Sequence, residues 1–123
     1  MKRIAVLLFL IFLIASPAGA KYVQTAKAKY QTSYQWSQYY TVEVSFLTGK
    51  ELNDSTRSFS YNAFSVYAVI FWGPGQASVI QLSGIFTCGL QTNQSCIQNV
   101  FSNLEGQDQE GRNWEICTKS YCF

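Results

Sequence analysis

The segment YAVIFWGPGQASVIQL at residues 67–82 constrains the fold of this chain most strongly. Two apolar runs flank a Gly-Pro-Gly turn, and neither run alternates cleanly with polar residues. Pro74 presets the φ angle of its turn position, and Gly75 can adopt the positive φ that a type II turn requires. The sequence therefore predicts a β-hairpin whose strands run from residue 64 or 66 to 72 and from 77 to about 82.

Pairing the two strands about this turn places Trp72 opposite Ala77 and Ile70 opposite Val79. Both faces of the hairpin would then be largely apolar, which is typical of a central element that is covered twice. A lipid bilayer is the wrong cover, because the turn breaks any helical span and a lipid-facing strand would alternate. We expect one face to meet a helix and the other to meet a long strand.

That long strand is predicted at residues 34–46. Even-numbered positions there are mostly aromatic or aliphatic and odd-numbered positions are polar, as in a strand with one buried and one wet face. Tyr34, Trp36 and Tyr40 could form a platform for stacking sugars, but they share the even face with three aliphatic or aromatic core candidates. We therefore assign these three rings to the core, and we expect the polar residues 21–33 to form a loose lead-in.

A short helix is predicted over about residues 94–104. Asn93 or Ser95 can cap its start, and Gly106 can end it. The apolar residues that recur there at helical spacing are Ile97, Val100, Phe101 and Leu104. This helix is the expected cover of one hairpin face.

The remaining segments predict a loop at 50–58, a strand that begins near Ser58 and a strand at 114–117. A tight turn at 109–112 precedes the last strand, with Gly111 at positive φ. The predicted class is α+β and mostly β: a small antiparallel sheet or partly open barrel of about five or six strands with one short helix, stabilised by disulfides.

The first 20 residues have the form of a cleavable secretory signal. Two basic residues precede the apolar run 4–15, and Ala18-Gly19-Ala20 supplies a small-x-small cleavage site. The run is shorter than the roughly 20 apolar residues of a spanning helix. We expect a single mature domain at 21–123 that is secreted or periplasmic and has no membrane span.

Loss of that signal removes two of the nine Lys and Arg residues, which leaves seven against seven Asp and Glu. A net charge near zero argues against nucleic acid as a partner, because affinity for nucleic acid comes largely from neutralising phosphates.

The cysteines number four, an even count that predicts a disulfide framework in a short exported chain. Zinc is disfavoured, because the chain has no His and the cysteines lack C-x-x-C spacing. Three pairings are possible in principle. Short loops close readily, and this favours Cys88–Cys96 and Cys117–Cys122.

Catalysis is not predicted. General acid–base and nucleophilic sites draw on His, paired carboxylates or activated Ser and Cys, and here only late carboxylates remain as candidates. They are Glu105, Asp108, Glu110 and Glu115. A small secreted enzyme that uses them is the alternative hypothesis; neither a cofactor nor a metal is expected, because the calcium-loop order is missing. Asn53 and Asn93 match the glycosylation acceptor pattern.

Within 67–79, the stretch FWGPGQASV resembles a strand of the small periplasmic inhibitors of c-type lysozyme, which have export signals and form small β-barrels. The Ser-Gly-x-x-Tyr element of that family is not present, because Ser83-Gly84 is followed by Ile-Phe-Thr and lies after this stretch. The resemblance implies a small exported inhibitor. The sequence thus predicts a non-enzymatic binding or structural module, which uses Phe71, Trp72 and Pro74 at the hairpin tip to contact another protein or a glycan.

Overall fold

The structure is a computed structural model that describes residues 22–84, 88–89, 92–98 and 103–123. The expected signal at 1–20 and Lys21, the expected first residue after its cleavage, lie outside the described residues. The elements are β2 (Tyr22–Thr32), β3 (Gln35–Trp36), β4 (Tyr40–Thr48), α2 (Gly49–Thr56), β5 (Val66–Gly73), β6 (Gln76–Leu82), α3 (Gln94–Gln98), β7 (Leu104–Gln107), β8 (Asn113–Cys117) and a 3₁₀ turn, η2 (Ser120–Cys122).

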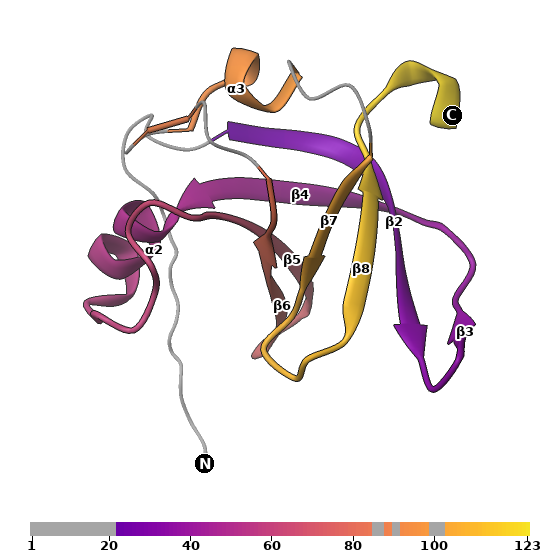
Figure 1. The fold of residues 1–123 in the computed structure, drawn as a ribbon, viewed down its shortest axis with the longest axis horizontal. Helices are drawn as coiled ribbons and strands as arrows, with labels where there is room; N and C mark the ends of the chain where they lie inside the picture. The colour runs from indigo at the N-terminus through magenta and orange to yellow at the C-terminus, as the bar shows by residue number, and fades with distance from the viewer. Residues whose placement is uncertain (1–21, 85–87, 90–91, 99–102) are drawn as a thin grey trace.

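Six strands close into an antiparallel barrel (Figure 1). The neighbour order is β2-β4-β5-β6-β7-β8, and β8 pairs back onto β2, while β3 is an additional strand on the outside of β2. Closure depends on β2, which pairs with β4 along its first part and with β8 from Lys27 to Tyr30. The predicted mostly-β class is confirmed, and the barrel is closed.

The prediction of a loose lead-in at 21–33 is wrong, because these residues form the longest strand described, β2. Ala26 and Ala28 point into the barrel and are fully buried. The inward positions at the centre of β2 are small alanines, so the alternation of apolar and polar residues that indicates a strand is weak in the sequence. The strand is therefore stabilised by its two neighbours more than by its own apolar content.

The predicted strand at 34–46 is divided into β3 and β4. Val44 and Phe46 are fully buried, as predicted, but Tyr34 is 95% exposed and Trp36 is 43% exposed. Their assignment to the core is wrong. Ser33 adopts a positive φ of 53°, and the hairpin that turns there pairs β3 with the last residues of β2, beyond the end of the β2–β4 ladder.

Residues 50–58, predicted as a loop, contain helix α2. A capping box starts it: Glu51 N donates to Thr48 Oγ1 at 3.2 Å, and Thr48 N donates to Glu51 Oε1 at 2.8 Å. Leu52 is the buried apolar residue of the helix and packs on the outer side of the hairpin against Leu47, Tyr67 and Val69.

The strand expected from near Ser58 is also wrong. Residues 58–65 are not a strand in the structure. The Asn53 side chain holds this connection instead, because its Nδ2 donates to Tyr61 O at 2.9 Å and its Oδ1 accepts from Tyr61 N at 3.1 Å.

The hairpin is confirmed, with Gly75 at a φ of 72°. Its register differs from the prediction: Ile70 pairs with Ser78 and Phe71 with Ala77, and an irregularity lies between Phe71 and Gly73. This irregularity displaces Trp72 from the ladder. The inner face of the hairpin contributes to the barrel core. Leu52 of α2 packs on the outer face at Tyr67 and Val69, whereas Phe71 on that face is 67% exposed.

The helix predicted over 94–104 is described only as α3, of five residues. Asn93 caps it as predicted, since its Oδ1 accepts from Cys96 N at 3.0 Å. Leu104 begins strand β7, which contradicts its place in the helix, and residues 99–102 lie outside the described part. Gly106 does not end a helix but lies in β7, where an added Cβ would overlap the backbone carbonyl of Gln81.

Both predicted disulfides are confirmed, Cys88–Cys96 and Cys117–Cys122, and none of the four cysteines is free. The turn before β8 has Gly111 at a φ of 83°, as predicted. The disulfides fit an oxidising or extracellular compartment.

Candidate functional site

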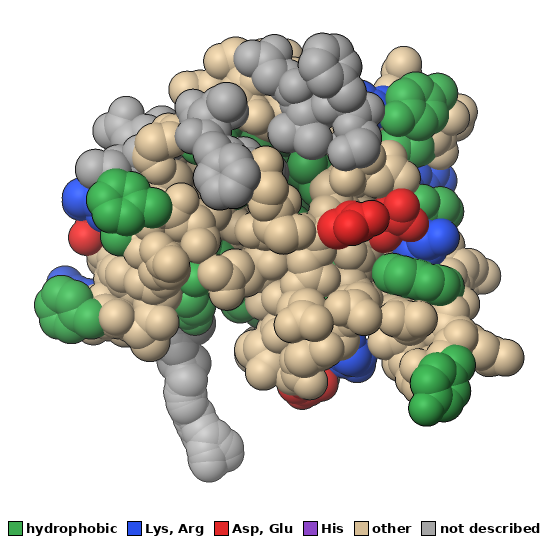
Figure 2. All heavy atoms as spheres, viewed as in Figure 1, with side chains coloured by type: hydrophobic (Ala, Val, Ile, Leu, Met, Phe, Trp, Pro, Cys, Tyr) green, Lys and Arg blue, Asp and Glu red, His purple; other side chains and the backbone are tan. Residues whose placement is uncertain are grey.

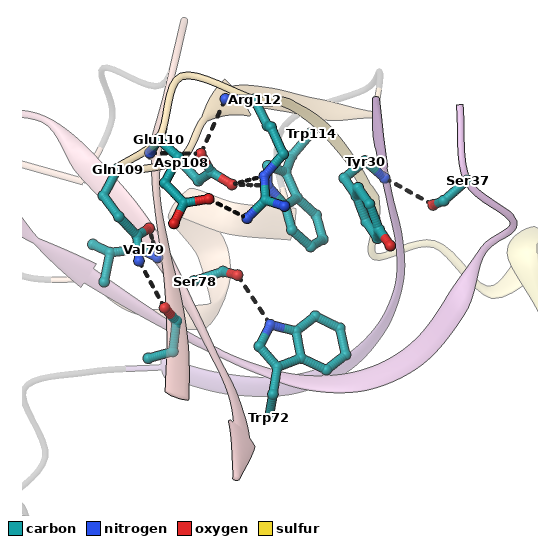
Figure 3. Close-up of polar contacts among 11 residues, drawn as sticks. Tyr30, Ser37, Trp72, Ser78, Val79, Asp108, Gln109, Glu110, Arg112 and Trp114 are labelled. Carbon is teal, nitrogen blue, oxygen red and sulfur yellow. Dashed lines mark hydrogen bonds and ion pairs between the residues drawn. The ribbon is translucent and has the colours of Figure 1, made fainter. Parts of the chain in front are cut away.

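The predicted binding tip is divided between exposed and packed residues. Phe71 is 67% exposed, and Pro74 is exposed. Trp72 is 43% exposed, but its Nε1 donates to Ser78 Oγ at 2.9 Å, inside the end of the barrel (Figure 3). Phe71 and Pro74 are thus available to contact a partner, whereas the Trp72 ring is partly buried and hydrogen-bonded within the protein.

Trp72 belongs to a cluster of four rings that we call the aromatic plug: Tyr30, Tyr40, Trp72 and Trp114. Trp72 lies 6.2 Å from Tyr40 and 6.2 Å from Trp114 between ring centroids, and Tyr30 lies 5.1 Å from Trp114. The β4–β5 ladder ends at the pair of Val44 and Ile70. Large rings therefore fill the end of the barrel beyond the last backbone pair.

At the same end of the barrel, a side-chain amide takes the place of a strand partner for β6. Strand β6 pairs with β7 only at Gln81 and Leu82. Nearer the start of β6, Gln109 Oε1 accepts from Val79 N at 2.9 Å and Gln109 Nε2 donates to Ala77 O at 2.7 Å (Figure 3). The amide satisfies the backbone of β6 on the edge opposite β5, where the β6–β7 ladder does not extend.

Asp108, one of the late carboxylates, is a structural anchor. Its buried carboxylate accepts from Trp114 Nε1 at 2.9 Å, from Arg112 N and Nε at 3.0 Å each, and from Glu110 N at 2.8 Å (Figure 3). Burial alone would raise the pKa of this carboxyl, but the hydrogen bonds outweigh it and hold the pKa below its ordinary value of 3.8. Each of its two oxygens accepts two hydrogen bonds, which tie Trp114 and Arg112 to the turn before β8.

The four late carboxylates fall into two pairs, in one of which Arg112 joins Asp108 to Glu110. Glu110 forms an exposed ion pair with Arg112 at 2.9 Å. Glu105 and Glu115 are direct partners across β7 and β8, on the outer wall of the barrel. Among the described residues, no three His, Cys, Asp or Glu side chains are grouped so that they could hold a metal ion.

The outer wall carries a shallow depression of about 630 Å³, which we call the outer groove. Its floor includes the buried Leu82 and Trp114. The exposed side chains around it come from β3, β6, β7, β8 and the residue after β6: Trp36, Gln81, Ser83, Glu105, Gln107 and Asn113. Figure 2 shows acidic side chains over β7 and β8 with a hydrophobic side chain close beside them. The barrel interior, by contrast, is filled by apolar side chains.

A row of amides crosses three strands at the groove. Gln107 Nε2 donates to Asn113 Oδ1 at 3.0 Å, and Asn113 Nδ2 donates to Gln31 Oε1 at 3.0 Å. Gln81, opposite Gln107 in the β6–β7 ladder, donates to Ser65 Oγ at 3.0 Å. An amide nitrogen has two N–H groups, so Gln81, Gln107 and Asn113 each keep a second donor beyond these bonds.

Lys29 holds the aromatic wall of the groove. Its Nζ lies 5.0 Å from the ring centroid of Trp36 and 4.9 Å from that of Tyr39, and it forms an ion pair with Glu115 at 3.2 Å. Ser37 N donates to Tyr30 O at 2.7 Å, which ties the chain after Trp36 to β2. The ring is therefore fixed in place although it is exposed.

Sequence reasoning missed this groove because it placed Trp36 in the core. A signal was present in the strands themselves, where Gln31, Gln81 and Gln107 occupy positions that alternate with inward residues. An outward amide at the same height on neighbouring strands forms a polar row. The strand order, which the sequence did not supply, is what brings these amides together.

Comparison with protein-family models, with curated proteins and with solved structures finds no match for this chain. In the described part of the chain, no helix has the length and apolar character needed to cross a membrane.

Proposed function

We propose that the protein is a secreted or periplasmic, non-enzymatic binding domain and that the outer groove is its ligand surface. The observation that carries this proposal is the exposed ring of Trp36, held by Lys29 beside a row of amides with spare donors. An exposed ring fixed next to convergent polar groups is the usual composition of a ligand site.

Three further observations support binding in preference to catalysis. The signal pattern of residues 1–20 and the two disulfides favour an exported protein. The barrel interior is packed, so a ligand must bind on the outside. Three of the four late carboxylates are engaged within the fold: Asp108 accepts four hydrogen bonds, and Glu110 and Glu115 form ion pairs with Arg112 and Lys29.

The hairpin tip is a second candidate surface. Phe71 is 67% exposed beside the exposed Pro74, and an exposed aromatic at a turn can anchor a partner protein. This surface suits a small inhibitor-type protein, in line with the resemblance of FWGPGQASV to the lysozyme inhibitors.

The test is an NMR titration of the oxidised mature chain, 21–123, with a panel of soluble oligosaccharides and short peptides. We expect shifts confined to the Trp36 indole N–H and the side-chain amides of Gln81, Gln107 and Asn113. Shifts confined to the Phe71 region would transfer the function to the tip. If no compound in the panel shifts the groove, the proposal is refuted.

A further inference from the structure

The outer groove matches the two-sided chemistry of a sugar ring. A pyranose presents C–H groups on its face and hydroxyls at its rim, and each hydroxyl both donates and accepts. The Trp36 ring offers an apolar surface for the face, and C–H contacts to a π system are weakly attractive. The amides of Gln107 and Asn113 offer donors and acceptors for adjacent hydroxyls.

The site is also organised before any ligand arrives. Trp36 is positioned by Lys29, and the amides already bond to one another across β7, β8 and β2. Ordering flexible side chains on binding costs roughly 0.5–1.5 kcal/mol each. A preformed row avoids much of this cost, which matters for a shallow groove that buries little of its ligand.

Charge limits which sugars fit. Glu105 lines the groove and is exposed, and its carboxylate has no hydrogen bond or ion pair within the described part of the chain. Glu115, directly opposite, is compensated by Lys29. The groove therefore has an excess of negative charge, which repels a sugar acid and attracts an amino group.

We propose that the ligand of the outer groove is an oligosaccharide whose sugars are neutral or carry an amino group, an inference that rests on the proposed binding function. The depression of about 630 Å³ has room for a short oligosaccharide, within the usual range of ligand sites of about 300–1,000 Å³. The amides contact hydroxyls, Trp36 stacks on a ring face, and Glu105 accepts from an amino group where one is present.

The test uses three soluble tetrasaccharides with the oxidised mature chain: N-acetylated chitotetraose, its fully deacetylated counterpart and tetragalacturonate. We expect the first two to shift the Trp36 indole signal and to give saturating calorimetric isotherms. Tetragalacturonate should give neither. Glu105→Gln should weaken binding of the deacetylated tetramer about fivefold or more and leave chitotetraose unchanged.

Variants separate the groove from the tip. Trp36→Ala should weaken both accepted sugars at least about tenfold, as loss of a central aromatic contact does, whereas Phe71→Ala should leave them unchanged. Trp36 lies on the two-residue β3 outside the barrel; if Trp36→Ala fails to fold, Gln107→Ala gives the same comparison. The inference is refuted if the folded groove variant binds as the wild type does, or if the protein prefers tetragalacturonate. It is also refuted if neither chitotetraose nor its deacetylated counterpart binds. Peptides that shift the groove while these sugars do not would leave the binding function standing and refute only the sugar assignment.

Discussion

Replacing Asp108 with Asn tests how the closed end of the barrel is stabilised. The side-chain carboxylate is fully buried and accepts four hydrogen bonds, one of them from the buried Trp114 indole. The amide of Asn has one acceptor oxygen, and its NH₂ group would face either the two backbone donors or the donors of Trp114 and Arg112. At least two of the four donors then lose their acceptor.

The magnitude follows from those donors. Leaving a buried donor unpaired costs about 1–3 kcal/mol, and hydrogen bonds to a charged group contribute about 1.5–3 kcal/mol each. The Trp114 N–H is buried, whereas the Arg112 side chain can turn to water. We therefore expect Asp108→Asn to lower the free energy of unfolding by about 2–4 kcal/mol at pH 7.

The effect should depend on pH with a definite sign. The pKa of Asp108 is lowered in the folded state, so its contribution is present above the unfolded value of about 4 and is lost as the pH falls through the folded pKa. The difference in unfolding free energy between wild type and Asp108→Asn should therefore shrink below about pH 4.

Urea denaturation of both oxidised proteins, followed by tryptophan fluorescence at pH 7 and at pH 3, measures these differences. Glu110→Gln is the matched control, because it removes an exposed ion pair to the same Arg112. Its cost should be about 0–1 kcal/mol. If Asp108→Asn cost no more than this control at pH 7, the assignment of Asp108 as the anchor would be refuted.

Two further substitutions test the barrel. Gly106→Ala should cost about 1–3 kcal/mol, because the new Cβ meets the backbone of Gln81. Gly73→Ala should be nearly neutral, because its Cβ would meet only the Gln76 side-chain oxygen at 3.8 Å, an ordinary contact. Thermal melts compare the two variants, and equal midpoints would contradict the close approach of β6 and β7. Trp72→Ala should lower the free energy of unfolding by about 2 kcal/mol, less than the roughly 3–5 kcal/mol expected for a fully buried Trp, because the ring is 43% exposed but packed and bonded to Ser78. Urea denaturation measures this loss, and no loss of stability would mean that Trp72 lies outside the aromatic plug.

The features predicted correctly from the sequence depend on nearby residues. The turn at Gly75, the turn at Gly111 and the disulfide Cys88–Cys96 each involve residues close together in the chain. Helix α2 was also encoded locally, by the capping box of Thr48 and Glu51. It was missed because its helical face has little apolar content, so that periodicity alone did not reveal it.

The register of the hairpin and the exposure of Trp36 could not be obtained in this way. The hairpin pairs in a different register because Trp72 is not paired in the ladder and packs instead among rings from β2, β4 and β8. Trp36 becomes exposed because a turn at Ser33 sends β3 outside the barrel. Both outcomes depend on contacts between strands far apart in the sequence, and a period-two pattern carries no information about which strands become neighbours.

The outer groove exists only when the barrel is closed. Trp36 of β3 lines one side of the groove and Gln31, at the end of β2, bonds to Asn113, whereas the rest of the lining comes from residues 81–114. The β2–β8 ladder joins these two parts, and Tyr30 packs on Trp114 in the last pair of that ladder. Since Asp108 anchors Trp114, a change at Asp108 alters the groove through the fold. Trp36 has no such role in closure, and for this reason its removal is the clean test of ligand binding.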